Sequence, residues 1–150
     1  MLNQQGKVKF VKGSILMPQT AGLRFVLSFA SMSGTADGPL HEIFSKKWVK
    51  VRQDAKGWYA NKNGAYKLGA LQQTAVQSDT VVLHLLCKNE KGEVDVEGLK
   101  LALKAAEKLV TYEHGSVHVS NHLVSECAEL KELMEEALVS KGLCVTYYEE

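Results

Sequence analysis

The chain has 150 residues, of which 45% are hydrophobic and 23% are charged, as is typical of a soluble globular protein. This length suits one domain, so we expect residues 1–150 to form a single domain. With 18 basic and 17 acidic residues the formal net charge is +1, which argues against a nucleic-acid partner, since such partners need a clustered basic face.

No apolar run reaches the roughly 18 residues that a membrane-spanning helix needs, so we expect no membrane segment. Residues 1–6 lack the apolar core of a signal peptide. The cysteines Cys87, Cys127 and Cys144 stand in apolar surroundings and form no C-x-x-C pair. This usage favours reduced, buried thiols and a cytoplasmic location.

The first third of the chain predicts two strands and a helix. Residues 7–12 alternate in a way that indicates a strand near a sheet edge, and residues 24–31 form an apolar run of strand length. After a small-residue loop, Pro39 opens an amphipathic helix that we expect to run to about Gln53. Proline suits a first helical position because its missing N–H would be unpaired there anyway.

The middle of the chain predicts two further strands and a second helix. Residues 66–76 are a strand candidate weakened by Gly69 and two glutamines. Residues 81–87 form the most continuous apolar run, as expected of a central strand covered on both faces. A helix follows from about Asp95 to Tyr112, with apolar residues at helical spacing.

The last third predicts a short strand at 117–119, a helix that Ser125 caps and Gly142 closes, and a final strand at 143–148. Strands therefore alternate with three helices. This order predicts an α/β fold in which one sheet is covered on both faces.

The passage from strand 24–31 through a glycine-containing loop into the Pro39 helix is the main functional signal. Such loops keep side chains away from a ligand, and a helix start presents unpaired N–H groups and a positive dipole. The pattern is typical of anion and nucleotide sites. An ordinary strand–helix connection without a ligand remains the alternative.

Three stretches of the chain resemble the macro domain family of ADP-ribose-binding modules, in particular its small branch of ADP-ribose hydrolases and phosphatases. Residues 8–16 (VKFVKGSIL) are similar to that branch's opening strand and turn. Residues 25–44 resemble its second strand, glycine-rich loop and first helix, and residues 126–148 its closing helix and strand. The resemblance implies a three-layer α/β/α sandwich with a central mixed sheet, and a pocket for ADP-ribose.

The resemblance also implies the residues that bind this ligand. They are Ser14, Ile15, Ser31, Ser33, Gly34, Thr35, Gly38, Asn121 and His122. The chain departs from the family in three places: Ser14 replaces the acid that accepts from the adenine amino group, Asp37 brings like charge toward a diphosphate, and residues 120–125 contain no glycine.

The family's catalytic acid has no clear counterpart in this chain. Glu126 is nearby, but we expect it in the first turn of the C-terminal helix, where an acid complements the helix dipole. The catalytic residues therefore stay unassigned, with Asn121 and Glu126 as the first substitutions to make. No cofactor is expected.

The histidines offer weaker signals. His114, His118 and His122 recur at four-residue spacing, which would suit zinc on a helix, but the stretch between them reads as a strand. Surface or edge histidines are the preferred interpretation, and no metal site is assigned. His84 interrupts an apolar strand, either as a hydrogen-bonded core residue or in contact with a ligand.

Three functions follow, in order of preference. The first is a module that binds ADP-ribose or a related nucleotide derivative, with Tyr147 or Tyr148 either stacking on the ligand or packing at the sheet edge. The second is a degenerate scaffold that acts through a protein partner, favoured by the missing glycines and by Asp37. The third is a hydrolase of ADP-ribosyl bonds.

Overall fold

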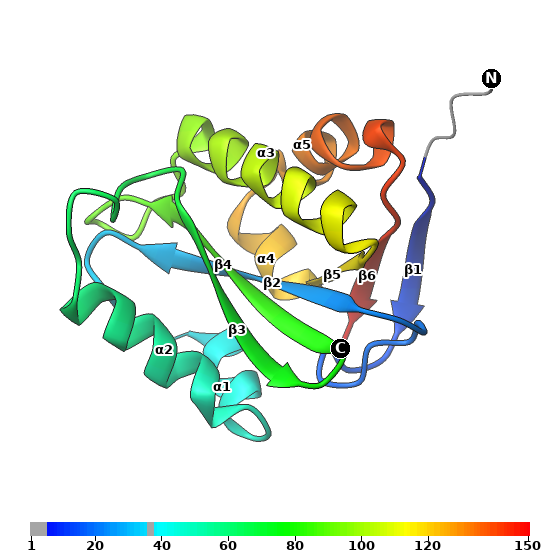
Figure 1. The fold of residues 1–150 in the computed structure, drawn as a ribbon, viewed down its shortest axis with the longest axis horizontal. Helices are drawn as coiled ribbons and strands as arrows, with labels where there is room; N and C mark the ends of the chain where they lie inside the picture. The colour runs from blue at the N-terminus through cyan, green and yellow to red at the C-terminus, as the bar shows by residue number, and fades with distance from the viewer. Residues whose placement is uncertain (1–5, 36–37) are drawn as a thin grey trace.

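The computed structural model describes residues 6–35 and 38–150, and its framework is one six-stranded sheet (Figure 1). The strand order is β1-β6-β5-β2-β4-β3. In chain order the strands are β1 (Val8–Lys12), β2 (Arg24–Ser31), β3 (Leu71–Gln77), β4 (Thr80–Lys88), β5 (Ser116–Ser120) and β6 (Val145–Glu149). All neighbouring strands pair in parallel except β3, which is antiparallel to β4, so the sheet is mixed.

Helices cover both faces of this sheet (Figure 1). The α-helices are α1 (Pro39–Ser45), α2 (Val49–Ala60), α3 (Val96–Glu113), α4 (Asn121–Glu126) and α5 (Leu130–Ala137), and a 3₁₀ turn, η1, spans Val139–Lys141. Helices α1 and α2 lie on one side of the sheet and α3 and α5 on the other. The predicted α/β/α sandwich with a central mixed sheet is therefore confirmed.

The two central parallel strands are buried along nearly their whole length. Every residue of β2 from Phe25 to Ser31 is buried, and β4 is buried at seven of its nine positions. A strand covered on both faces needs apolar residues in succession rather than in alternation. The apolar runs at 24–31 and 81–87 therefore correctly identified the interior strands, and β1 is an edge strand as expected.

The helix expected from Pro39 to about Gln53 is instead two helices. Helix α1 ends at Ser45, and α2 continues from Val49 to Ala60, beyond the expected end. The break occurs where the Lys46 and Lys47 amides bond only three residues back, to Ile43 and Phe44, which tightens the last turn. Trp48, in the turn between the two helices, is buried in the core. The apolar residues expected on one face of a single helix are therefore divided between two helices of different direction.

The C-terminal region also differs from expectation. Ser120, not Ser125, caps a helix: its Oγ accepts from the His122 amide at 3.1 Å and starts α4, a short helix in place of the expected loop. Ser125 lies inside α4, and Glu126 is the last residue of α4 rather than part of a first turn. Gly142, at φ 93°, closes the 3₁₀ turn after α5.

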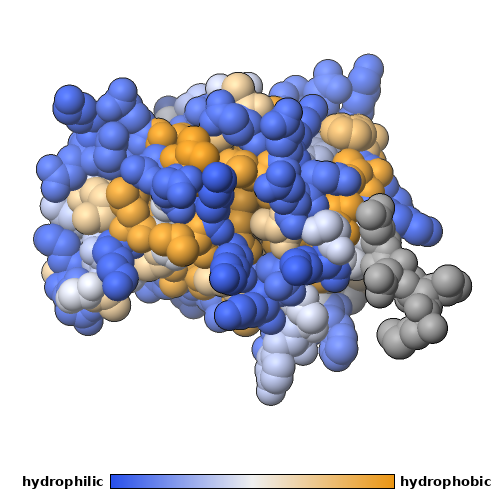
Figure 2. Space-filling view, turned by 90° about the horizontal axis from the view of Figure 1, so that it is seen from above, coloured by the Kyte–Doolittle hydropathy of each residue, from blue (hydrophilic) through white to orange (hydrophobic). Residues whose placement is uncertain are grey.

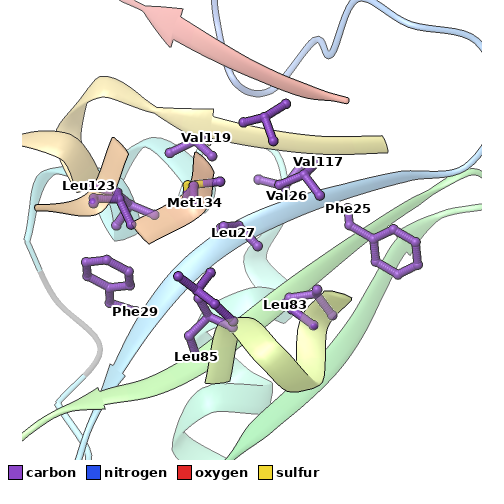
Figure 3. Close-up of a cluster of buried hydrophobic side chains, with 14 of the residues drawn as sticks. Phe25, Val26, Leu27, Phe29, Leu83, Leu85, Val117, Val119, Leu123 and Met134 are labelled. Atoms are coloured by element: carbon purple, nitrogen blue, oxygen red, sulfur yellow. The ribbon is translucent and has the colours of Figure 1, made fainter. Parts of the chain in front are cut away.

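The core includes residues packed between the sheet and α3, α4 and α5, together with residues of α1 and α2 such as Phe44 and Val51. Figure 3 shows Leu27 and Phe29 of β2 close to Leu123 of α4 and Met134 of α5. These four residues are among the core, with exposures of 3% or less. On the outer side of α3 and α5, charged side chains alternate with exposed apolar ones (Figure 2). The core therefore fixes the carboxyl end of β2 against α4.

Within the described residues no helix is both long and apolar enough to cross a membrane. The three cysteines are all free thiols. Cys87 and Cys127 are buried as expected, but the expectation was wrong for Cys144, which is exposed just before β6.

Candidate functional site

A cavity of about 250 Å³ opens at the carboxyl ends of β2 and β4. Its walls come from β2, the loop after it, the start of α1, the end of β4 and helix α4. The lining residues are Ser28, Phe29, Ser31, Thr35, Gly38, Pro39, Leu40, His41, Lys88, Gly92, Leu123 and Glu126. Ligand sites in α/β sheets lie at this end of the strands, because the loops that leave parallel strands converge there.

The loop after β2 carries a chain of hydroxyl groups along one wall of the cavity. Ser31 Oγ lies 2.6 Å from Ser33 Oγ, which lies 3.1 Å from Thr35 Oγ1. Ser31 Oγ also accepts from the Ser33 amide at 3.0 Å and donates to the Asn89 carbonyl at 3.3 Å. These bonds hold the loop in one conformation and leave Thr35 at the cavity.

Two glycines give this loop its course. Gly34 has φ 79°, and a Cβ at this position would lie 2.3 Å from Cγ of Tyr59, so the ring packs directly on the glycine backbone. Gly38 has φ 104° and directly precedes Pro39, the first residue of α1. Both positions favour glycine, because glycine adopts a positive φ with little strain. At Gly34 the Tyr59 ring also leaves no space for a side chain.

Ser31, Thr35 and Gly38 therefore line the cavity as predicted site residues, and Ser33 and Gly34 support the same loop. Ala36 and Asp37 lie outside the described residues. The predicted repulsion between Asp37 and a diphosphate therefore stays a prediction.

The cavity also contains an ion pair that the sequence analysis did not identify. Lys88 Nζ, at the end of β4, pairs with the carboxylate of Glu126, at the end of α4. Both side chains are partly exposed and both residues line the cavity. The sequence indicates that Lys88 lies at a strand end, because it directly follows the longest apolar run. It gives no sign of the pairing with Glu126.

Two of the other predicted site residues, Ile15 and His122, lie beside a second acid, Glu150. Its Oε1 accepts from the Ile15 amide at 3.2 Å, and its Oε2 accepts from Ser120 Oγ at 3.3 Å. His122 Nε2 lies 4.0 Å from the same Oε2. Ser14 Oγ accepts from the Leu16 amide, which stabilises the turn after β1. Glu150 is 135 positions from Ile15, so sequence spacing gives no sign of the contact.

Asn121 lies beside a second cavity, of about 240 Å³, between β1, β6, α4 and α5. Its Oδ1 is buried and has no hydrogen-bond partner among residues 6–35 and 38–150. The rings of Phe10 and Tyr147 stack at 5.2 Å in this cavity, and Lys131 Nζ lies 4.9 Å from the Phe10 ring. Tyr147 thus packs at the sheet edge, while Tyr148 is fully buried.

The three histidines considered for zinc do not come together. The preferred interpretation as surface or edge histidines was wrong for His118, which is fully buried on the interior strand β5. Its Nδ1 lies 2.8 Å from Tyr148 Oη and its Nε2 lies 2.8 Å from Ser116 Oγ. His114 ends α3 in the left-handed conformation. Burial lowers the pKa of His118 to about 4, so its ring is neutral at pH 7.

His84 belongs to a buried polar chain behind the first cavity. Its Nε2 lies 2.8 Å from Thr74 Oγ1, and Thr74 Oγ1 donates to Asp54 Oδ2 at 2.8 Å. Burial, with a smaller contribution from His41, lowers the pKa of His84 to about 4. The preferred interpretation of a hydrogen-bonded core histidine fits this environment.

No protein-family model matches the chain, and no curated protein sequence matches it. Solved structures do. A protein from Bacteroides thetaiotaomicron has a TM-score of 0.87 at 19% identity, covering 96% of this chain and 100% of its own. A macrodomain protein from Streptomyces coelicolor has a TM-score of 0.86 at 19% identity, covering 96% and 99%.

A third structure is Thermosipho africanus DarTG in complex with ADP-ribose. Its TM-score is 0.73 at 15% identity, and the match covers 96% of this chain and 42% of that one. Identities this low establish shared architecture. The chain has the macro domain fold.

Proposed function

We propose that this chain binds ADP-ribose or a related nucleotide derivative, with the diphosphate and its outer sugar in the cavity between β2, α1 and α4. The observation that carries the proposal is the cavity itself: it lies at the carboxyl ends of parallel strands and is lined by hydroxyl groups, two glycines and one lysine. The DarTG structure, part of which has a similar fold, is a complex with ADP-ribose.

The lining suits an anionic, hydroxyl-rich ligand. Thr35 supplies a hydroxyl group, and Lys88 supplies a positive charge that can pair with a phosphate. At about 250 Å³ the cavity is slightly smaller than the ~300–1,000 Å³ that encloses a drug-sized ligand, so only part of ADP-ribose enters it. The rest of the ligand extends over α4 toward Asn121 and Ile15.

Glu150 supplies the acceptor for the adenine end. The family's acid is replaced by Ser14, whose hydroxyl group bonds within its own turn. The Glu150 carboxylate, 3.2 Å from the Ile15 amide, stands beside that position. A carboxylate there accepts from the adenine amino group, as the missing acid would. The proposed adenine contacts are therefore Ile15 and Glu150, with Asn121 and His122 nearby.

Calorimetric titration of the purified chain with ADP-ribose tests the proposal. We expect saturable heat and a rise in melting temperature, because a ligand that binds only the folded state stabilises it. Lys88→Met should weaken the binding. The absence of both heat and thermal shift at high micromolar protein would contradict the proposal and favour the scaffold alternative.

Hydrolysis of an ADP-ribosyl bond is a second candidate function, favoured by the carboxylate of Glu126 in the cavity wall. A carboxylate beside the outer sugar can activate a water molecule as a general base. The test is the release of free ADP-ribose from an ADP-ribosylated peptide. Turnover that disappears in Glu126→Gln while ADP-ribose affinity is retained would support hydrolysis. The absence of turnover by the parent chain would contradict this candidate function.

A further inference from the structure

Ser28, in the middle of β2, is a buried polar residue that reaches the cavity. It is 0% exposed, yet it is one of the lining residues. Its Oγ has no hydrogen-bond partner within the part of the chain that the structure describes. Buried hydroxyl groups normally have a partner, so a partnerless one at a cavity wall points to a group that arrives with a ligand.

His84 stands directly beside Ser28 on the neighbouring strand. The two residues are register partners in the parallel β2–β4 pair, so their side chains project to the same face of the sheet. His84 is also 0% exposed, and its Nδ1 has no hydrogen-bond partner among the described residues. Two adjacent buried side chains thus each have an unused polar atom.

The direction of hydrogen bonding fixes what these atoms can accept. The single hydroxyl proton of Thr74 goes to the Asp54 carboxylate, so Thr74 Oγ1 must accept from His84 Nε2–H. The neutral ring then carries no proton on Nδ1, which is an acceptor. The structure has no hydrogen bond between Ser28 Oγ and this Nδ1. A ligand hydroxyl group that donates to Ser28 Oγ would leave the Ser28 proton free to be donated to Nδ1, so the bond forms only with the ligand.

We propose that Ser28 is a binding residue for a hydroxyl group of the ligand's sugar, and that His84 is the positioning residue that makes Ser28 an acceptor. The completed chain runs from the sugar hydroxyl to Ser28 Oγ, to His84, to Thr74 and to Asp54, each member donating to the next. This inference rests on the proposed function and adds the recognition of a sugar.

The same chain discriminates against a phosphate at this point. A phosphate oxygen that carries no proton has nothing to donate to Ser28 Oγ, and His84 is held neutral rather than cationic. A sugar hydroxyl group has a proton to donate. Phosphate is therefore expected near Lys88, and the sugar near Ser28, within the one cavity.

The test compares ADP-ribose with ADP, which lacks the outer sugar, by calorimetry on the parent chain and on Ser28→Ala. We expect Ser28→Ala to weaken ADP-ribose binding about tenfold, the size of one well-made hydrogen bond, and to leave ADP binding unchanged. His84→Gln, which retains a donor for Thr74 but loses the Nδ1 acceptor, should show the same selective loss.

A structural role would give a different pattern. Because Ser28 Oγ is unpartnered, Ser28→Ala should not lower the melting temperature, whereas Ser120→Ala, which removes a bonded cap, should lower it. In the parent chain, ¹⁵N spectroscopy of His84 should show an unprotonated Nδ1 whose signal moves with ADP-ribose and not with ADP.

The outcomes separate the two proposals. If the parent chain binds ADP-ribose and Ser28→Ala binds it equally well, or loses ADP and ADP-ribose to the same extent, this inference is overturned and the proposed function stands. If the parent chain binds neither ligand, both fall. A protonated His84 Nδ1 overturns this inference even where the variants do not fold.

Discussion

The ammonium group of Lys88, at the end of β4, pairs with the carboxylate of Glu126, at the end of α4, and both residues line the cavity between β2 and α1. The pair joins the sheet to the short helix that replaces the expected loop. Since the two charges offset each other, the cavity presents little net charge from this pair until a ligand competes for Lys88. The pair therefore controls how strongly the cavity attracts an anion.

Removing one member of the pair at a time should affect ADP-ribose affinity differently. Lys88→Met leaves a carboxylate facing the diphosphate and should weaken binding about tenfold or more, the range for a hydrogen bond to a charged group. Glu126→Gln frees the lysine and should leave binding equal or tighter. Calorimetry at low ionic strength measures both, and a loss of affinity in Glu126→Gln would contradict this account.

Glu150→Gln should change the choice of base. The amide keeps an oxygen that can accept from the Ile15 amide, but it loses the negative charge that favours the adenine amino group. Inosine diphosphate has a carbonyl group where ADP has this amino group, so the parent chain should prefer ADP. We expect Glu150→Gln to reduce that preference about tenfold.

The comparison of ADP with inosine diphosphate serves as its own control, because both ligands have the same phosphates. Equal affinities for the two in the parent chain would exclude Glu150 as the adenine acceptor. An unchanged preference for ADP in Glu150→Gln would show that the negative charge of Glu150 does not determine the choice of base.

These residues show how far the sequence predicted the site. The strand–loop–helix signal at 24–44 predicted the loop whose residues Ser31, Thr35 and Gly38 line the cavity, because local patterns decide where a strand ends and which loop follows. Glu150 could not be predicted in this way, since its contact with Ile15 depends on the parallel pairing of β1 with β6.

The two wrong helix predictions have a common cause. Apolar spacing identified the buried stripe around Trp48 but not the change of direction at that residue, which depends on how α1 and α2 pack on the sheet. Ser120 and Ser125 are equally good caps by residue type. Which of them starts a helix is decided by where β5 ends, and that is set by its pairing with β6.

Gly34→Ala should destabilise the fold much more than Gly22→Ala, a matched control. Both glycines have positive φ, 79° and 82°, so both alanines carry about 1–2 kcal/mol of backbone strain. Only at Gly34 does the new Cβ meet another group, the Tyr59 ring at 2.3 Å. We expect Gly34→Ala to lower the free energy of unfolding by about 1–3 kcal/mol more than Gly22→Ala, measured in urea.

A double-mutant cycle with Tyr59→Ala identifies the cause. If the ring is the obstacle, Gly34→Ala should cost no more in the Tyr59→Ala background than Gly22→Ala costs in the parent chain. An extra cost of the same size in both backgrounds would show that the contact with Tyr59 is not responsible.

His84 and His118 should make the fold less stable as the pH falls from 6.5 to about 4. Burial holds both pKa values near 4, against 6.5 for an unperturbed histidine, so in this window the unfolded chain binds protons that the folded chain does not. Each histidine then adds a slope of up to about 1.4 kcal/mol per pH unit to the loss of unfolding free energy, and neither adds any above pH 6.5.

Carboxylates titrate in part of the same window, so the quantity to compare is the pH slope of the unfolding free energy of variants, measured in urea between pH 7 and pH 5. His118→Gln should reduce the slope by the contribution of one histidine. Equal slopes in the parent chain and in His118→Gln would mean that folding does not lower the pKa of His118. A protonated ring would then donate from both nitrogens, to Tyr148 Oη and to Ser116 Oγ.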